Sequence, residues 1–99
     1  MKTFAERRAH LATLRASTIQ DEYVEDQIEA LLPTVYGLLT MEIMGLELEL
    51  DVLKSHAGYY IGTFDYEEGP MSRESEYFAT REEAQAALDA ASWMQRYNP

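Results

Sequence analysis

The chain has no cysteine, so it forms neither a disulfide bond nor a thiolate metal site. Its only histidines, His10 and His56, lie far apart and belong to no ligand spacing such as HExxH, so we expect no metal. No apolar run approaches the roughly 20 residues of a membrane span, and the N-terminal residues lack the apolar run of a signal peptide. These absences predict a soluble, cytoplasmic protein that contacts no membrane.

Motifs for catalysis and for cofactor binding are absent as well. The spacing of Gly58, Gly62 and Gly69 differs from that of a phosphate-binding loop, and no GxSxG or P-loop pattern occurs. Carboxylates are so abundant that no single pair indicates acid–base catalysis. We therefore expect neither enzymatic activity nor a cofactor.

Basic residues are scarce, with 8 lysines and arginines against 18 aspartates and glutamates and a formal net charge of −10. Direct binding to nucleic acid or to an anionic membrane depends on lysine and arginine, so both are disfavoured. A basic protein partner remains. Apolar residues make up 46% of the sequence, which is enough for a core, so the 99 residues are expected to form a single domain.

The acidic residues are concentrated in one block that contains no lysine or arginine. Its nine carboxylates are Asp21, Glu22, Glu25, Asp26, Glu29, Glu42, Glu47, Glu49 and Asp51. Uncompensated charge repels itself and destabilises the compact state. The block is therefore either a solvated face that keeps the protein soluble or a surface that meets something basic. Residues 22–29 span roughly 10 Å of helix, over which DNA carries about six charges, so the second interpretation includes imitation of a polyanion.

The N-terminal part, residues 1–45, is predicted to be helical. The segment from Phe4 to Ala16 holds the only basic stretch, made by Arg7, Arg8 and Arg15. We interpret it as an amphipathic helix that leans on the acidic remainder. Ser17 and Gln20 have the spacing of a capping box, which predicts that a second helix begins there.

This second helix is predicted to carry apolar side chains on one side and Glu22, Glu25, Asp26 and Glu29 on the other. Pro33 is expected to end or kink it, and proline is also favoured at the first position of a new helix. Thr34 to Met44 is apolar nearly all round, which predicts a helix buried centrally or at a subunit contact. Gly45 is expected to end that helix.

Residues 46–99 predict a β-β-β-α arrangement. Leu46 to Val52 alternates leucine or valine with Glu47, Glu49 and Asp51, which is typical of a half-buried strand, although a heptad of apolar residues leaves a helix open as the alternative. Tyr59 to Phe64 and Ser72 to Phe78 are predicted to pair as a hairpin. Thr80 and Glu83 form a capping box for a helix that extends to about Arg96.

The expected fold class is therefore α+β, with N-terminal helices packed with a small three-stranded antiparallel sheet and a C-terminal helix. Six aromatic residues gather in the predicted hairpin: Tyr59, Tyr60, Phe64, Tyr66, Tyr77 and Phe78. They either pack in the core with hydroxyls that reach water, or form an exposed patch that binds a partner. In the second interpretation, Tyr60 and Tyr66 are the anchors.

The stretch from His56 to Leu88, with HAGYYIGTF, SRES, EYF and TREEAQAAL, resembles a segment of small proteins encoded by phages and prophages. The resemblance covers about a third of the chain. Small, acidic, cysteine-free proteins of this origin look like anti-CRISPR and other anti-defence inhibitors. This class has no common fold, so the resemblance implies an inhibitor acting in the host cytoplasm and assigns no functional residues.

We therefore expect an inhibitor that binds a basic, nucleic-acid-handling surface of a bacterial defence (CRISPR-Cas) complex and blocks nucleic-acid binding. The expected partner-binding residues are Glu22, Glu25, Asp26, Glu29, Glu47, Glu49, Asp51, Tyr60 and Tyr66. The alternative is a phage assembly or accessory protein that forms a homodimer through Leu38 to Met44. A small-ligand pocket beneath the hairpin is a third hypothesis, without a motif behind it.

Overall fold

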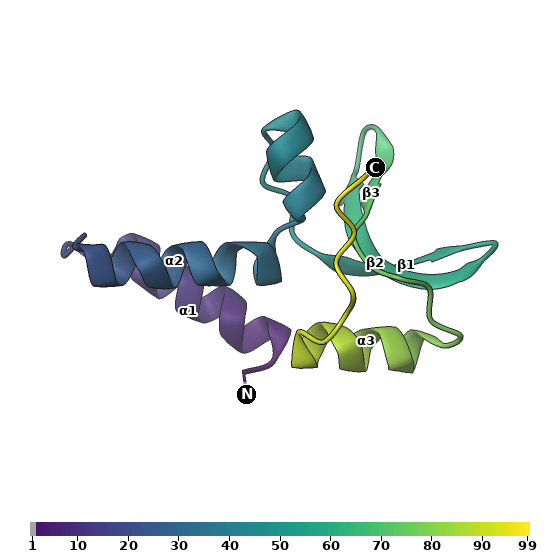
Figure 1. The fold of residues 1–99 in the computed structure, drawn as a ribbon, viewed down its shortest axis with the longest axis horizontal. Helices are drawn as coiled ribbons and strands as arrows, with labels where there is room; N and C mark the ends of the chain where they lie inside the picture. The colour runs from purple at the N-terminus through teal and green to yellow at the C-terminus, as the bar shows by residue number, and fades with distance from the viewer. Residues whose placement is uncertain (1) are drawn as a thin grey trace.

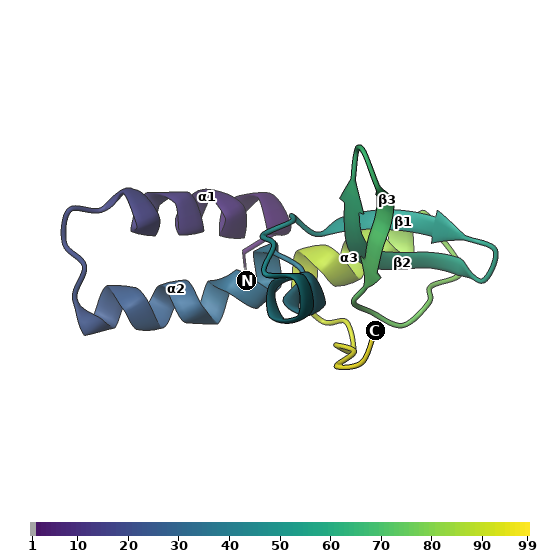
Figure 2. The same ribbon diagram turned by 90° about the horizontal axis from the view of Figure 1, so that it is seen from above.

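The computed structural model describes residues 2–99, and its fold is α+β, as predicted (Figure 1). The elements in chain order are α1 (Phe4–Ala16), α2 (Glu22–Val35), the π-helix η1 (Thr40–Met44), β1 (Asp51–Ser55), β2 (Gly58–Asp65), β3 (Gly69–Arg73) and α3 (Arg81–Ala90). The three strands form an antiparallel sheet in the order β1-β2-β3. Figures 1 and 2 show α1 and α2 as a helical arm that extends away from the globule formed by the sheet and α3.

Both helices of the arm begin at a side-chain cap. At α1, the Thr3 hydroxyl accepts from the Glu6 N–H, and the Glu6 carboxylate accepts from the Thr3 N–H. At α2, the Asp21 carboxylate accepts from the Val24 N–H at 3.0 Å. The predicted capping box at residues 17 and 20 is therefore wrong. Aspartate caps as well as serine does, and its charge also suits the positive end of the helix dipole.

The chain does not start a new helix at Pro33, because α2 continues through it to Val35. Pro33 lies in the last turn, where it removes one hydrogen bond and the helix ends soon afterwards. At Tyr36 the backbone is extended and forms an isolated bridge to Glu49. The predicted helix from residue 34 to 44 is thus interrupted at Tyr36 and Gly37. Residues 34 and 35 end α2, residues 38–44 are helical, and Gly45 ends η1 at φ 68°, as predicted.

The prediction of a strand from residue 46 is correct only in part. Residues 46–50 are not in the sheet, and the pairing with β2 begins at Asp51. None of the residues 46–53 is helical, so the alternative of a helix in this segment is excluded. The segment before β1 pairs instead with the end of α2, through Gly37 N–H to Leu48 O at 3.0 Å and Leu50 N–H to Val35 O at 2.9 Å. This pairing joins the arm to the sheet.

The third strand and the last helix also differ from their predicted bounds. β3 is Gly69–Arg73, earlier than the predicted strand at 72–78, because Gly69 at φ 89° turns the chain immediately. Phe78 forms only an isolated bridge. Thr80 caps α3 by accepting from the Glu83 N–H, which is one half of the predicted capping box; no return bond from the Thr80 N–H to the Glu83 carboxylate is found in residues 2–99. The helix ends at Ala90, before the predicted end near Arg96, because Ala91 adopts φ 52°.

The core lies between α3 and one face of the sheet. It is formed by Leu50, Val52, Ile61, Ala84, Ala87 and Leu88. The alanines have short side chains, so α3 lies close against the strands. Phe4, from the start of α1, packs against this cluster and brings the base of the arm to the globule.

Arg7, which was expected to face the acidic residues, is 4% exposed. Its guanidinium donates to the backbone oxygens of Leu88, Asp89, Thr34 and Lys2, at 2.6, 2.9, 3.1 and 2.9 Å. Two of these oxygens lie at the end of α3 and one at the end of α2, where helix dipoles favour a cation. Burial lowers the pKa of Arg7. Arg7 therefore fixes the arm to the globule.

Candidate partner-binding surface

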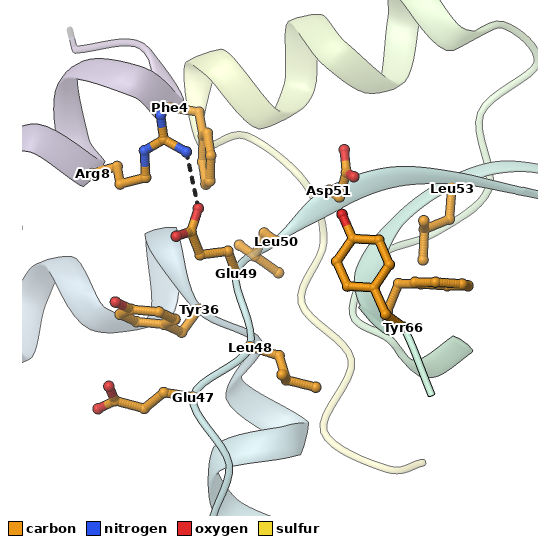
Figure 3. Close-up of a pocket in the computed structure, with 11 residues that line it drawn as sticks. Phe4, Arg8, Tyr36, Glu47, Leu48, Glu49, Leu50, Asp51, Leu53 and Tyr66 are labelled. Atoms are coloured by element: carbon orange, nitrogen blue, oxygen red, sulfur yellow. Dashed lines mark hydrogen bonds and ion pairs between the residues drawn. The ribbon is translucent and has the colours of Figure 1, made fainter. Parts of the chain in front are cut away.

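A groove with a volume of about 840 Å³ lies between α1, residues 47–51 and the turn after β2 (Figure 3). Its lining residues are Phe4, Arg8, Tyr36, Glu47, Leu48, Glu49, Leu50, Asp51, Leu53, Phe64 and Tyr66. The structure thus brings together four of the predicted partner-binding residues: Glu47, Glu49, Asp51 and Tyr66.

Two of the three carboxylates of the groove are paired with arginines of α1. Glu49 accepts from Arg8 at 3.1 Å, and Glu47 accepts two hydrogen bonds from Arg15 at 3.0 and 2.8 Å (Figure 3 marks the first). The Arg15 hydrogen bonds lower the pKa of Glu47, and the same bonds raise the pKa of Arg15. Asp51 has no ion pair within residues 2–99. The interpretation of the first helix as leaning on the acidic remainder holds for Arg8 and Arg15.

The two predicted aromatic anchors lie in opposite environments. Tyr66 is 98% exposed and stands edge-to-face with Phe64, with ring centroids 6.0 Å apart. Tyr60 is 7% exposed, packs edge-to-face against Tyr77, and has its pKa raised by burial. Its ring lies beside Gly62, where a Cβ would come within 2.8 Å. The prediction that Tyr60 anchors a partner at the surface is therefore wrong, because the strand register turns it inward.

The acidic face of α2 consists of Glu22, Glu25, Asp26 and Glu29. All four side chains are exposed, and none forms an ion pair or a side-chain hydrogen bond within the part of the chain that the structure describes. Tyr23 stands among them and is 73% exposed. Sequence reasoning missed Tyr23, although its position next to Glu22 and away from the apolar side of the helix signalled it.

The acidic face of α2 and the groove are separate surfaces. Arg8 and Arg15 of α1 neutralise Glu49 and Glu47. Figure 2 shows the tip of the β2–β3 hairpin on the α1 side of the molecule and α2 on the other. The two rows of carboxylates therefore do not form one continuous track like that of a phosphate backbone, because the basic helix lies against one of them.

Within residues 2–99, no three histidine, aspartate or glutamate side chains are grouped so that they would hold a metal ion. In the same residues, no helix has both the length and the apolar composition needed to cross a membrane. No protein-family model matches the chain, and no curated protein or solved structure is detectably similar to it.

Proposed function

We propose that this protein is a small, non-enzymatic inhibitor that binds a basic, nucleic-acid-handling surface of a bacterial defence complex of the CRISPR-Cas type. The acidic face of α2 makes the contact and excludes the nucleic acid. The observation that carries the proposal is the set of four exposed carboxylates on α2 that form no ion pair within residues 2–99. The choice of a defence complex rests on the resemblance of residues 56–88 to phage and prophage proteins.

The placement of the charge supports this proposal over a merely solvated face. Arginines of α1 compensate the carboxylates of the groove, but no lysine or arginine occurs from residue 16 to residue 53 to compensate α2. An uncompensated row repels itself, whereas a basic partner surface relieves that repulsion. Tyr23 adds a side chain that a partner can desolvate.

The shape of the molecule supports the same contact. The arm extends away from the globule (Figures 1 and 2), so α2 is accessible along its length to a channel or cleft in a partner. Arg7 fixes the base of the arm through bonds to Thr34, Leu88 and Asp89. A rigidly held charged helix loses less entropy on binding than a mobile one.

The test is reversal of charge on α2 in the variant Glu25→Lys/Asp26→Lys/Glu29→Lys. The assays are plaque formation by a phage on a strain whose CRISPR-Cas system targets it, and binding of labelled target DNA by the purified effector complex. The unaltered protein should restore plaques and displace the DNA. The variant should be at least about tenfold weaker, and the effect of the unaltered protein should fall as salt rises, because exposed charges are screened.

A matched control carries the same three reversals at exposed carboxylates elsewhere, Glu42→Lys/Glu68→Lys/Glu82→Lys, and should keep its activity. Equal loss in both variants would show that net charge alone matters. If the unaltered protein neither restores plaques nor displaces DNA from any effector type, the proposed function is wrong.

A second candidate function, the homodimeric assembly or accessory protein, is favoured by one observation. Ile43, Met44 and Leu46 are 54%, 45% and 42% exposed on and after η1, although Leu39 is buried. Contiguous exposed apolar side chains mark association surfaces. Light scattering after size-exclusion chromatography distinguishes the two functions, because a tight dimer that is indifferent to salt favours the second.

A further inference from the structure

One end of the groove holds apolar surface that the fold of this chain does not use. Phe64 is 42% exposed and Tyr66 is 98% exposed, and both rings line the groove. They stand edge-to-face, with ring centroids 6.0 Å apart, and both remain open to solvent. Exposed aromatic residues that border a concave surface are typical of binding sites.

Asp51 also lines the groove. Of the three carboxylates that line it, only that of Asp51 has no ion pair within residues 2–99. Asp51 accepts the N–H of Val52 at 2.8 Å, which uses one of the acceptor positions of its carboxylate. In Figure 3 the hydroxyl end of Tyr66 points toward Asp51. An anionic group and exposed aromatic rings therefore line the same groove, while Arg8 and Arg15 neutralise its other carboxylates.

The form of the groove favours a segment of another protein over a small molecule. Its volume of about 840 Å³ lies within the range of small-ligand pockets, but such pockets enclose most of the surface of their ligand. A groove with one wall formed by a fully exposed tyrosine cannot enclose a small ligand in this way. An extended segment that runs past the groove needs only to place one side chain in it.

We propose that the groove receives an arginine side chain from an exposed segment of the partner protein. The guanidinium stacks on Tyr66 and donates to the Asp51 carboxylate. Arginine fits this pairing better than lysine, because its planar group stacks on aromatic faces and donates two parallel hydrogen bonds to a carboxylate. Within this chain, Arg73 already stacks on Tyr77 at 4.2 Å. The inference rests on the proposed function in one respect, since both require a basic partner.

The test is titration of isotopically labelled full-length protein with blocked peptides of sequence Ser-Arg-Ser, followed by nuclear magnetic resonance. Two further peptides replace the arginine by lysine or by citrulline, which has the same shape without the charge. The arginine peptide should shift the amides of Asp51, Phe64 and Tyr66 in a saturable manner. The lysine peptide should bind at least about threefold more weakly, and citrulline should cause no saturable shift.

Two variants locate the site. Tyr66→Ala removes a side chain that is 98% exposed, and Asp51→Asn keeps an acceptor for the Val52 N–H, so both are expected to fold. Each should weaken the arginine peptide at least about fivefold. The matched control Glu67→Gln, which removes an exposed charge from the same turn, should leave the affinity unchanged.

Shifts that spread over α2, equal binding of arginine and lysine, or affinity unaffected by Tyr66→Ala and Asp51→Asn would each overturn the inference. Its failure is distinguishable from failure of the proposed function. If reversal of charge on α2 abolishes inhibition while Tyr66→Ala and Asp51→Asn leave it intact, the inhibitor proposal stands and the arginine site is wrong.

Discussion

The helical arm and the globule differ in how deeply their apolar side chains are buried. In the globule, Ile61, Ala84 and Leu88 are enclosed between the sheet and α3. In the arm, Leu11 and Val35 are buried, while the apolar side chains of residues 24–32 are only partly covered. Two helices packed side by side each bury only one stripe of side chains. A helix packed on a sheet encloses a core between the two layers. The globule therefore contains the core that stabilises the fold, whereas the arm provides an exposed surface.

The largest effect that tests this comparison is expected from Ile61→Ala. Ile61 is fully buried, and its truncation leaves a cavity in the core, so the free energy of unfolding should fall by about 4 kcal/mol. Urea denaturation measures the loss. The matched control Leu32→Ala, on the partly covered side of α2, should cost about 1–2 kcal/mol, because the site is already open to water. Equal losses would contradict the comparison.

A smaller loss is expected from Arg7→Met, which keeps the size of the side chain but removes the donors to four backbone oxygens. Loss of these hydrogen bonds should reduce the free energy of unfolding by about 2–3 kcal/mol. Hydrogen exchange should accelerate in α1 and α2 more than in β2. The exposed neighbour Arg8→Met serves as the control and should cost less than about 1 kcal/mol. Uniform acceleration across α1, α2 and β2 would show that the arm has no separate stability.

The smallest effect is expected from Arg15→Gln, and it depends on pH. Because the Arg15 hydrogen bonds lower the pKa of Glu47 in the folded state from its ordinary value of 4.5, the pair stabilises the protein above that value. The contribution is lost as the pH falls through the lowered pKa. Both side chains are partly exposed, so the variant should cost about 0.2–1 kcal/mol at neutral pH.

The pH dependence of Arg15→Gln is measured by thermal denaturation across pH, and the difference from the unaltered protein should vanish once the pH lies below the lowered pKa of Glu47. Arg81→Gln, which removes an arginine without an ion pair in the described residues, is the control. A difference for Arg15→Gln that persists at low pH would show that packing against Tyr36, and not the ion pair, is what Arg15 contributes.

Several parts of the fold were predictable because their causes are local. The bounds of α1, the stop at Gly45 and the cap at Thr80 each follow from a few neighbouring residues. The N-cap of α2 at Asp21 was missed because Ser17 and Gln20 also have the spacing of a capping box, and sequence alone does not rank the two caps. The start of β3 was missed because it is determined by the turn at Gly69, and not by the content of strand-forming aromatic residues further along the chain.

The amino-acid sequence by itself determined the α+β class, the concentration of acid between residues 21 and 51 and the apolar side of each helix. Composition and periodicity act within one element, so they can be read without coordinates. Only the tertiary structure decided which charges are compensated, that Tyr60 is buried while Tyr66 is exposed, and that Arg7 joins two helix ends. These outcomes depend on which segments far apart in the sequence come into contact, and the packing of the arm against the globule determines those contacts.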